Sequence, residues 1–193
     1  MGKVYACIEG RIRNFIDEQP VFFTATAPLA GDGHVNLSPK GRAGTLAVLD
    51  PLTLAYLHFG GSGAETIAHL RENGRTTLMW CAFTGPPKVL RVHGRGEPVF
   101  RDDPRWGELI PRFGEADGPS ARAIIVVRAE RIGDSCGFAV PFMDYREERT
   151  QHAEHFGRKT DEEFAAYCER KEHVGVSLDG LPALPLPLPP RTG

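Results

Sequence analysis

Short apolar runs bounded by turn residues recur along most of the chain, and this pattern predicts β-strands. The runs cover residues 21–27, 34–37, 45–49, 53–59, 77–83, 88–93, 97–100 and 123–132. Glycine, proline and aspartate separate them, and we expect connections at residues 29–33, 85–87 and 94–96. The first two runs form a hairpin in this interpretation. The pattern predicts about seven strands, most of them joined by short turns.

Helical spacing occurs first near the N-terminus. An apolar stripe of Ile8, Ile12, Phe15 and Ile16 predicts an amphipathic helix over residues 7–18. Three later helices are expected from similar patterns, over residues 104–113, 147–156 and 161–173.

One helix is expected inside the series of strands, after residue 59. Residues 62–65 (SGAE) fit a capping box, and Ile67 and Leu70 share one helical face. Asn73 followed by Gly74 offers a left-handed stop.

The C-terminal part has a different character from the strand region. Residues 136–145 (CGFAVPFMDY) are apolar but irregular, and residues 181–193 (LPALPLPLPPRTG) carry proline at nearly every second position. Because proline removes backbone donors, we expect an extended tail there. The sequence predicts one domain over residues 1–175 and a proline-rich tail over residues 176–193.

These elements favour a mainly β fold with helices (α+β), built as a small antiparallel barrel with a helical C-terminal extension. The sequence contains no internal repeat, and Gly-Pro punctuation between short runs argues against a helical bundle.

Composition narrows the functional classes. The 193 residues have a formal net charge of −2, so we expect no nucleic-acid partner. No run reaches the roughly 18 apolar residues that a membrane span needs, and the first residues do not follow the order of a signal peptide. We therefore expect no membrane partner and a cytoplasmic location. Four scattered cysteines predict reduced thiols, and we expect no metal site.

Two stretches carry candidate chemistry. Residues 58–66 (HFGGSGAET) place glycines at the start of the internal helix, where backbone N–H groups favour a phosphate, although glycine-rich turns also arise for steric reasons. In residues 34–42, Ser38, Lys40 and Arg42 lie close together at the end of a strand. They form either an anion site or a solvated turn.

The order of five segments is more specific than either stretch. VNLSPKG, LAYLHFGG, AHLRENGR, TTLMWCAF and VLRVHGRG follow one another at a spacing that resembles the pyridoxamine 5′-phosphate oxidase-like family of FMN-binding split barrels. The resemblance covers about residues 15–135. It implies an antiparallel split β-barrel, FMN bound at the interface of a homodimer, and a cytoplasmic flavoprotein that acts as an oxidoreductase on a small molecule.

The resemblance also implies a set of cofactor-binding positions. They are Val35, Asn36, Leu37, Ser38, Lys40, Ser62, Glu65 and Thr66. It places Lys40 near both flavin and substrate, with Arg42 behind it as a second substrate-binding residue. The arginine–lysine pair that grips the phosphate in the family is missing at the helix start. The family's C-terminal Arg-Leu-His-Asp-Arg segment is missing too, so vitamin B6 oxidation is not expected. No side chain is assigned as catalytic.

Alternatives remain within and outside this family. A deazaflavin has the same ring shape as FMN, and haem would need an axial ligand such as His34, His58 or His93. Phe138 or Phe142 could cap the flavin. A zinc site at His152, His155 and Cys168 or His173 lacks firm spacing. From another class, the chain could be a non-catalytic flavin-binding or stress-response protein whose proline-rich tail recruits a partner.

Overall fold

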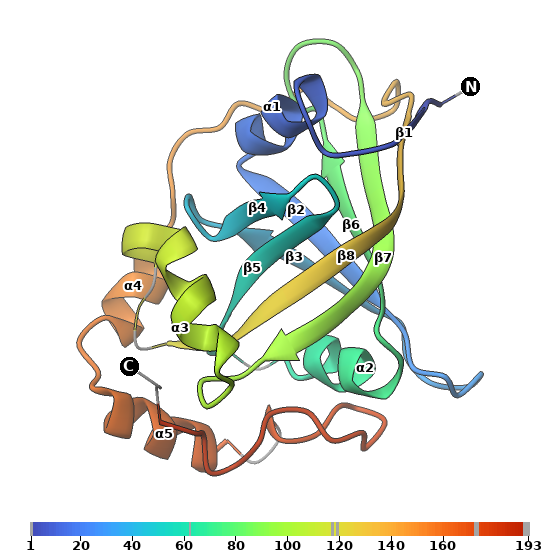
Figure 1. The fold of residues 1–193 in the computed structure, drawn as a ribbon. Helices are drawn as coiled ribbons and strands as arrows, with labels where there is room; N and C mark the ends of the chain where they lie inside the picture. The colour runs from blue at the N-terminus through green and yellow to red at the C-terminus, as the bar shows by residue number, and fades with distance from the viewer. Residues whose placement is uncertain (1, 62, 117, 119, 172–173, 191–193) are drawn as a thin grey trace.

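The computed structural model describes residues 2–61, 63–116, 118, 120–171 and 174–190. Figure 1 shows a strongly curled antiparallel sheet with helices around it. The strand order is β3-β2-β6-β7-β8-β5-β4, and β1 pairs with β8 off this path. The strands are β1 (Val4–Tyr5), β2 (Val21–Thr26), β3 (Asn36–Gly41), β4 (Leu46–Asp50), β5 (Thr53–Phe59), β6 (Arg75–Cys81), β7 (Val89–Val99) and β8 (Ala121–Ser135).

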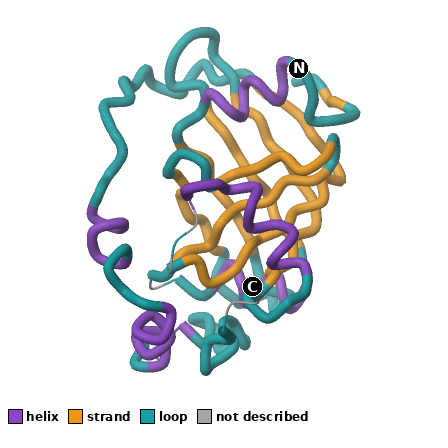
Figure 2. Tube along the Cα trace, turned by 60° about the vertical axis from the view of Figure 1, so that its left-hand side comes forward, coloured by secondary structure: helices purple, strands orange, loops and turns teal. Residues whose placement is uncertain are grey.

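The helices are short and lie outside the sheet (Figure 2). They are α1 (Arg11–Glu18), α2 (Glu65–Asn73), α3 (Arg105–Leu109), α4 (Gln151–Phe156) and α5 (Asp161–Glu169), and a 3₁₀ helix over Ile110–Ala116 follows α3. The antiparallel, half-barrel fold with helices is therefore confirmed. No helix in the described part of the chain is long and apolar enough to cross a bilayer.

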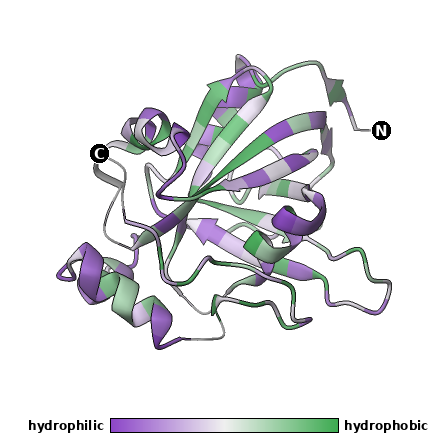
Figure 3. Cartoon of the chain, turned by 60° about the horizontal axis from the view of Figure 1, so that its bottom comes forward, coloured by the Kyte–Doolittle hydropathy of each residue, from purple (hydrophilic) through white to green (hydrophobic). Residues whose placement is uncertain are grey.

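Alternation along the strands builds the core. Buried and partly exposed residues alternate along β2, and its Phe22 ring stacks on Trp80 at a centroid distance of 5.6 Å. Tyr56 meets Phe22 edge-on at 5.4 Å. The strands carry both apolar and polar bands in Figure 3, as expected when one face of a sheet is buried.

The N-terminal helix is confirmed, with a later start than predicted. It begins at Arg11 because Gly10 has a φ of +49°, outside the helical region. All four residues of the predicted apolar stripe are nevertheless buried against the sheet.

The predicted connection at residues 94–96 is wrong, because these residues lie within β7. The pairing of β7 with β8 shifts register between His93 and Gly94. A Cβ at Gly94 would overlap the carbonyl oxygen of Arg128. Glycine there serves the close approach of two strands rather than a turn.

Ser38 and Lys40 lie within a strand and not in the turn that the sequence suggested for Ser38, Lys40 and Arg42. β3 runs through Gly41 and pairs with β2, which confirms the hairpin but moves its second strand. Pro39 is tolerated within β3 because this strand lies at the edge of the sheet.

The start of α2 also differs from the prediction. The cap position is Ala64, without a capping side chain, and the Glu65 carboxylate accepts a hydrogen bond from the Ala64 N–H at 3.1 Å. Ser62 lies outside the described residues. Gly74 ends the helix with a φ of 70°, as predicted.

The C-terminal segment lies against the end of the sheet near α2 (Figure 1). Ala183, Leu184 and Leu188 are buried in the main hydrophobic cluster. The Arg71 guanidinium donates to the Ala183 carbonyl, and the Asp179 carboxylate accepts from the His34 backbone N–H at 2.8 Å. The expected boundary at residue 175 stays a prediction.

Candidate functional site

A cavity of about 730 Å³ opens where β3, β5 and β8 meet the start of α2. Glycines 60, 61 and 63 form one side of it, and residues 147–149 with His152 form another. The polar side chains that line it include Ser38, Lys40, Arg42, His58, Glu65, Thr66, Arg122 and His152. This volume falls within the range of small-molecule sites.

β3 brings Ser38 and Lys40, two positions apart on one face of the strand, to this cavity. Asn36, Ser38 and Lys40 are partly buried, whereas Leu37 between them is 64% exposed. This follows from the two-residue period of a strand. Val35, Asn36 and Leu37 line a neighbouring pocket of about 520 Å³ that shares Gly63 and Glu65 with the main cavity.

Lys40 faces the cavity without a salt bridge or side-chain hydrogen bond to any described residue. Desolvation, followed by the positive charge of Arg122, lowers the pKa of Lys40 to about 8. The ammonium is therefore still charged at pH 7, but at a free-energy cost that an anion in the cavity would offset.

Arg122 is a further cation that lines the cavity, beside Lys40, Arg42 and Arg149, and it is 1% exposed. Its guanidinium donates to the carbonyl oxygens of Gly61, at 3.3 Å, and of Gly63. Burial lowers the pKa of Arg122 to about 10, which leaves it charged at neutral pH. Arg122 thus holds the backbone of Gly61 and Gly63, and the Glu65 carboxylate acts on its charge from a distance without forming a salt bridge with it.

His58 lies beside Arg122 and is 4% exposed. Desolvation, then the charges of Lys40 and Arg122, hold its pKa well below the ordinary value. His58 is therefore neutral across the physiological range. His152, on α4, meets the Phe59 ring edge-on at 5.0 Å, and burial lowers its pKa too.

Asn36 organises two hydroxyl groups at the cavity wall. Its amide nitrogen donates to Thr26 Oγ1 at 3.1 Å and to Thr66 Oγ1 at 3.0 Å, which uses both amide hydrogens. Ser38 donates its hydroxyl hydrogen to Asn36 Oδ1 at 3.0 Å. The Thr66 hydroxyl hydrogen and the Ser38 lone pairs remain for a ligand.

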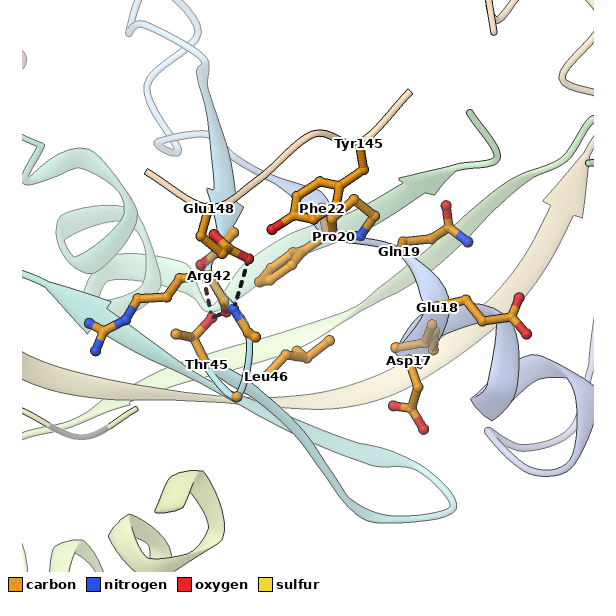
Figure 4. A pocket seen from close by; sticks show the side chains of 14 residues that line it. Asp17, Glu18, Gln19, Pro20, Phe22, Arg42, Thr45, Leu46, Tyr145 and Glu148 are labelled. Atoms are coloured by element: carbon orange, nitrogen blue, oxygen red, sulfur yellow. Dashed lines mark hydrogen bonds between the residues drawn. The ribbon is translucent and has the colours of Figure 1, made fainter. Parts of the chain in front are cut away.

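A second pocket, of about 450 Å³, adjoins the cavity and shares Arg42 and Glu148 with it (Figure 4). Glu148 Oε1 accepts from the Ala43 N–H at 3.2 Å, and Thr45 Oγ1 donates to the Arg42 carbonyl at 2.7 Å. The Arg42 guanidinium lies 5.1 Å from the Phe59 ring centre. Arg42 therefore lines both pockets.

The structure thus gathers most of the predicted site residues. Ser38, Lys40, Arg42, Glu65 and Thr66 line one cavity. Val35, Asn36 and Leu37 lie at the adjoining pocket, and Ser62 lies outside the described residues.

Other candidates are separated from this cavity. Phe138 and Phe142 are each 83% exposed and do not line it. Of the three histidines considered for haem, His58 alone lies in the cavity, whereas His34 bonds Asp179 and His93 bonds Thr77. Among the described residues, no group of three or more histidine, cysteine or acidic side chains gathers as metal ligands. His173 lies outside that part of the chain.

Sequence reasoning missed Arg122 and gave His58 only as a haem ligand. The available signal was an arginine immediately before the apolar run 123–132. In β8 that run pairs with β5, and His58 faces Ala123 in the register. Arg122 therefore lies next to His58 once the two strands meet.

Comparison with known proteins found relatives in one family. The sequence profile described as pyridoxamine 5′-phosphate oxidase matches residues 8–136. A protein of Aspergillus flavus named pyridoxamine 5′-phosphate oxidase family protein ustO is 40% identical over 141 residues, which cover 72% of this chain and 56% of that protein. The chain thus aligns with little more than half the length of this relative.

A solved structure shares the fold at low sequence identity. A histidine-to-alanine variant of HupZ from Group A Streptococcus has a TM-score of 0.54 and 18% identity, covering 66% of this chain and 99% of that chain. An FMN-binding protein from Syntrophomonas wolfei subsp. wolfei has a TM-score of 0.46 and 15% identity, covering 61% and 77% of the two chains.

Proposed function

Because this chain belongs to the pyridoxamine 5′-phosphate oxidase family, we propose that it binds FMN and acts as an oxidoreductase on a small organic molecule. One observation supports the cofactor best. Lys40 and Arg122 both face the cavity, and neither forms a salt bridge with a described carboxylate. Buried charge is costly unless it is paired, so this cavity suits an anion such as the phosphate of FMN.

The residues present fit a flavin nucleotide. Lys40, Arg122 and the Thr66 hydroxyl offer donors to the phosphate, and glycines 60, 61 and 63 leave room for close approach. When bound, the flavin supplies reversible two-electron transfer. The protein residues bind and orient it, and His152 and Phe59 cover part of the cavity wall. Arg42, which lines both pockets, is the proposed contact for an anionic substrate, together with Lys40.

We also propose that the protein acts as a homodimer. Val35 is 75% exposed, Leu37 64% and Leu178 77%, and the first two lie on or beside the edge strand β3. Exposed apolar residues gathered in this way are typical of an interface. The same pocket at Val35 and Leu37 would then be closed by a second copy.

The deciding experiment is an absorption spectrum of freshly purified protein, repeated after incubation with FMN, deazaflavin or haemin and desalting. Light scattering on the same sample gives the molar mass. We expect retained flavin absorbance on a dimer, and flavin reduction by a nicotinamide donor would support catalysis. Retention of deazaflavin or haem in place of FMN would overturn the proposed cofactor. Protein that retains none of the three would favour a non-catalytic role.

A further inference from the structure

The proposed function uses the charge of Arg122 but not the contact between Arg122 and His58, and both side chains of this contact are buried. Arg122 Nε lies 3.3 Å from His58 Nδ1, with the arginine as donor. His58 is on β5 and Arg122 on β8, so the contact joins two strands at the cavity. Both side chains are buried, and neither meets a described carboxylate in a salt bridge.

The hydrogen-bond direction determines the state of the imidazole. A guanidinium carries only donors, so His58 Nδ1 must present its lone pair. An imidazole whose Nδ1 accepts is neutral when its single hydrogen is on Nε2. The protonated ring would place an N–H against an N–H.

We propose that Arg122 is a positioning residue that holds His58 as the neutral Nε2–H tautomer, so that the cavity presents a fixed N–H donor to an acceptor atom of the bound molecule. The acceptor atom that this N–H can bind is a carbonyl oxygen, a heteroaromatic nitrogen or an oxyanion. An imidazolium would donate to the same kinds of atom but would favour the negatively charged one.

The groups that face His58 support this assignment. Burial disfavours a charged ring most strongly, and the cations Lys40 on β3 and Arg122 on β8 oppose a third positive charge there as well. A hydrogen bond with the backbone of His58 itself favours the charged ring, but its effect on the pKa is the smallest of the four. The same cavity is lined by Glu65 on α2, Arg42 after β3 and His152 on α4, whose own pKa is lowered. The segment before α4 adds Glu147, Glu148 and Arg149, and neither of these two carboxylates forms a salt bridge with His58. Glu65 accepts from the Ala64 N–H and forms no salt bridge with His58.

The first test measures the tautomer directly. Protein labelled with ¹⁵N-histidine is titrated from pH 8 to pH 5.5 by long-range ¹H–¹⁵N NMR, and His58→Gln identifies the His58 signal. We expect His58 to keep the neutral Nε2–H pattern throughout. Arg122→Met should let the ring populate the other tautomer, because Nδ1 no longer has to accept a hydrogen bond from the guanidinium. Titration of His58 near pH 6.5 in the wild-type protein, or an Nδ1–H pattern, would overturn the proposal even if Arg122→Met does not fold.

The second test measures the donor role and rests on the proposed cofactor. FMN affinity is measured by fluorescence for His58→Gln, whose amide N–H replaces the Nε2–H, and for His58→Leu, which has no donor. We expect His58→Gln to stay within about threefold of wild type and His58→Leu to bind about tenfold more weakly. His93→Leu, outside the cavity, is the matched control.

Each test can contradict its part of the proposal independently of the other. If no variant and no wild-type protein binds FMN, the proposed cofactor is wrong, while the NMR result still decides the role of Arg122. If His58→Leu binds FMN as well as wild type does, the donor role is wrong. Equal losses in His58→Gln and His58→Leu would contradict it as well.

Discussion

At the scale of single residues, Lys40 has opposite effects on stability and on binding. Its pKa in the folded protein, about 8, lies below the ordinary value of 10.5, so the charged form is disfavoured by folding. Replacing it by an apolar residue of similar length removes that cost. Lys40→Met should therefore raise the free energy of unfolding at pH 7 by about 1–2 kcal/mol, and weaken FMN binding about tenfold or more.

The pH dependence gives this prediction a definite sign. Below pH 8 the wild-type protein bears the full cost of the Lys40 charge, and this cost falls as the pH rises from about 8 to 10.5. The stability gain of Lys40→Met, measured by urea unfolding, should shrink over that interval. Lys3→Met, at an exposed lysine, serves as the control. A gain that stays constant up to pH 10.5 would contradict the explanation.

At the scale of elements, the contact between β7 and β8 depends on Gly94. A Cβ there would overlap the Arg128 carbonyl oxygen, which belongs to backbone and cannot turn aside. Gly94→Ala should therefore destabilise the protein by about 2–4 kcal/mol, as overpacking does. Gly31→Ala is the matched control, because a Cβ at Gly31 meets nothing within 4 Å. The melting temperatures of both variants are measured by thermal unfolding. If Gly94→Ala melts at the same temperature as Gly31→Ala, β7 and β8 can move apart to make room for the Cβ, and the prediction is wrong.

At the scale of the whole molecule, the segment after residue 175 contributes to the core. Leu184 is 3% exposed, whereas Leu29, which the proposed dimer interface does not include, is 64% exposed. Leu184→Ala should lower the free energy of unfolding by about 2–4 kcal/mol, and Leu29→Ala should change it by less than about 0.5 kcal/mol. Urea unfolding measures both. If Leu184→Ala has no effect, residues 176–193 are a separable tail, as the sequence predicts.

The sequence by itself determined the elements whose information is local. Short apolar runs predicted most strands, and the spacing of Ile8, Ile12, Phe15 and Ile16 predicted α1, because strand and helix periods are visible within a few residues. The order of five segments also led to the family, and with it to Lys40 and Thr66, which line the cavity.

Only the tertiary structure decided what depends on distant residues. Arg122 and His58 are 64 positions apart, and no local pattern links them until β8 pairs with β5. Gly94 looked like a turn because its need for space comes from a neighbouring strand. The buried leucines after residue 175 looked like a tail because proline-rich sequence has no periodicity to reveal a packed face. In each case the residue contacts a partner that is distant in the sequence, and only the folded chain brings the two together by packing or hydrogen bonding.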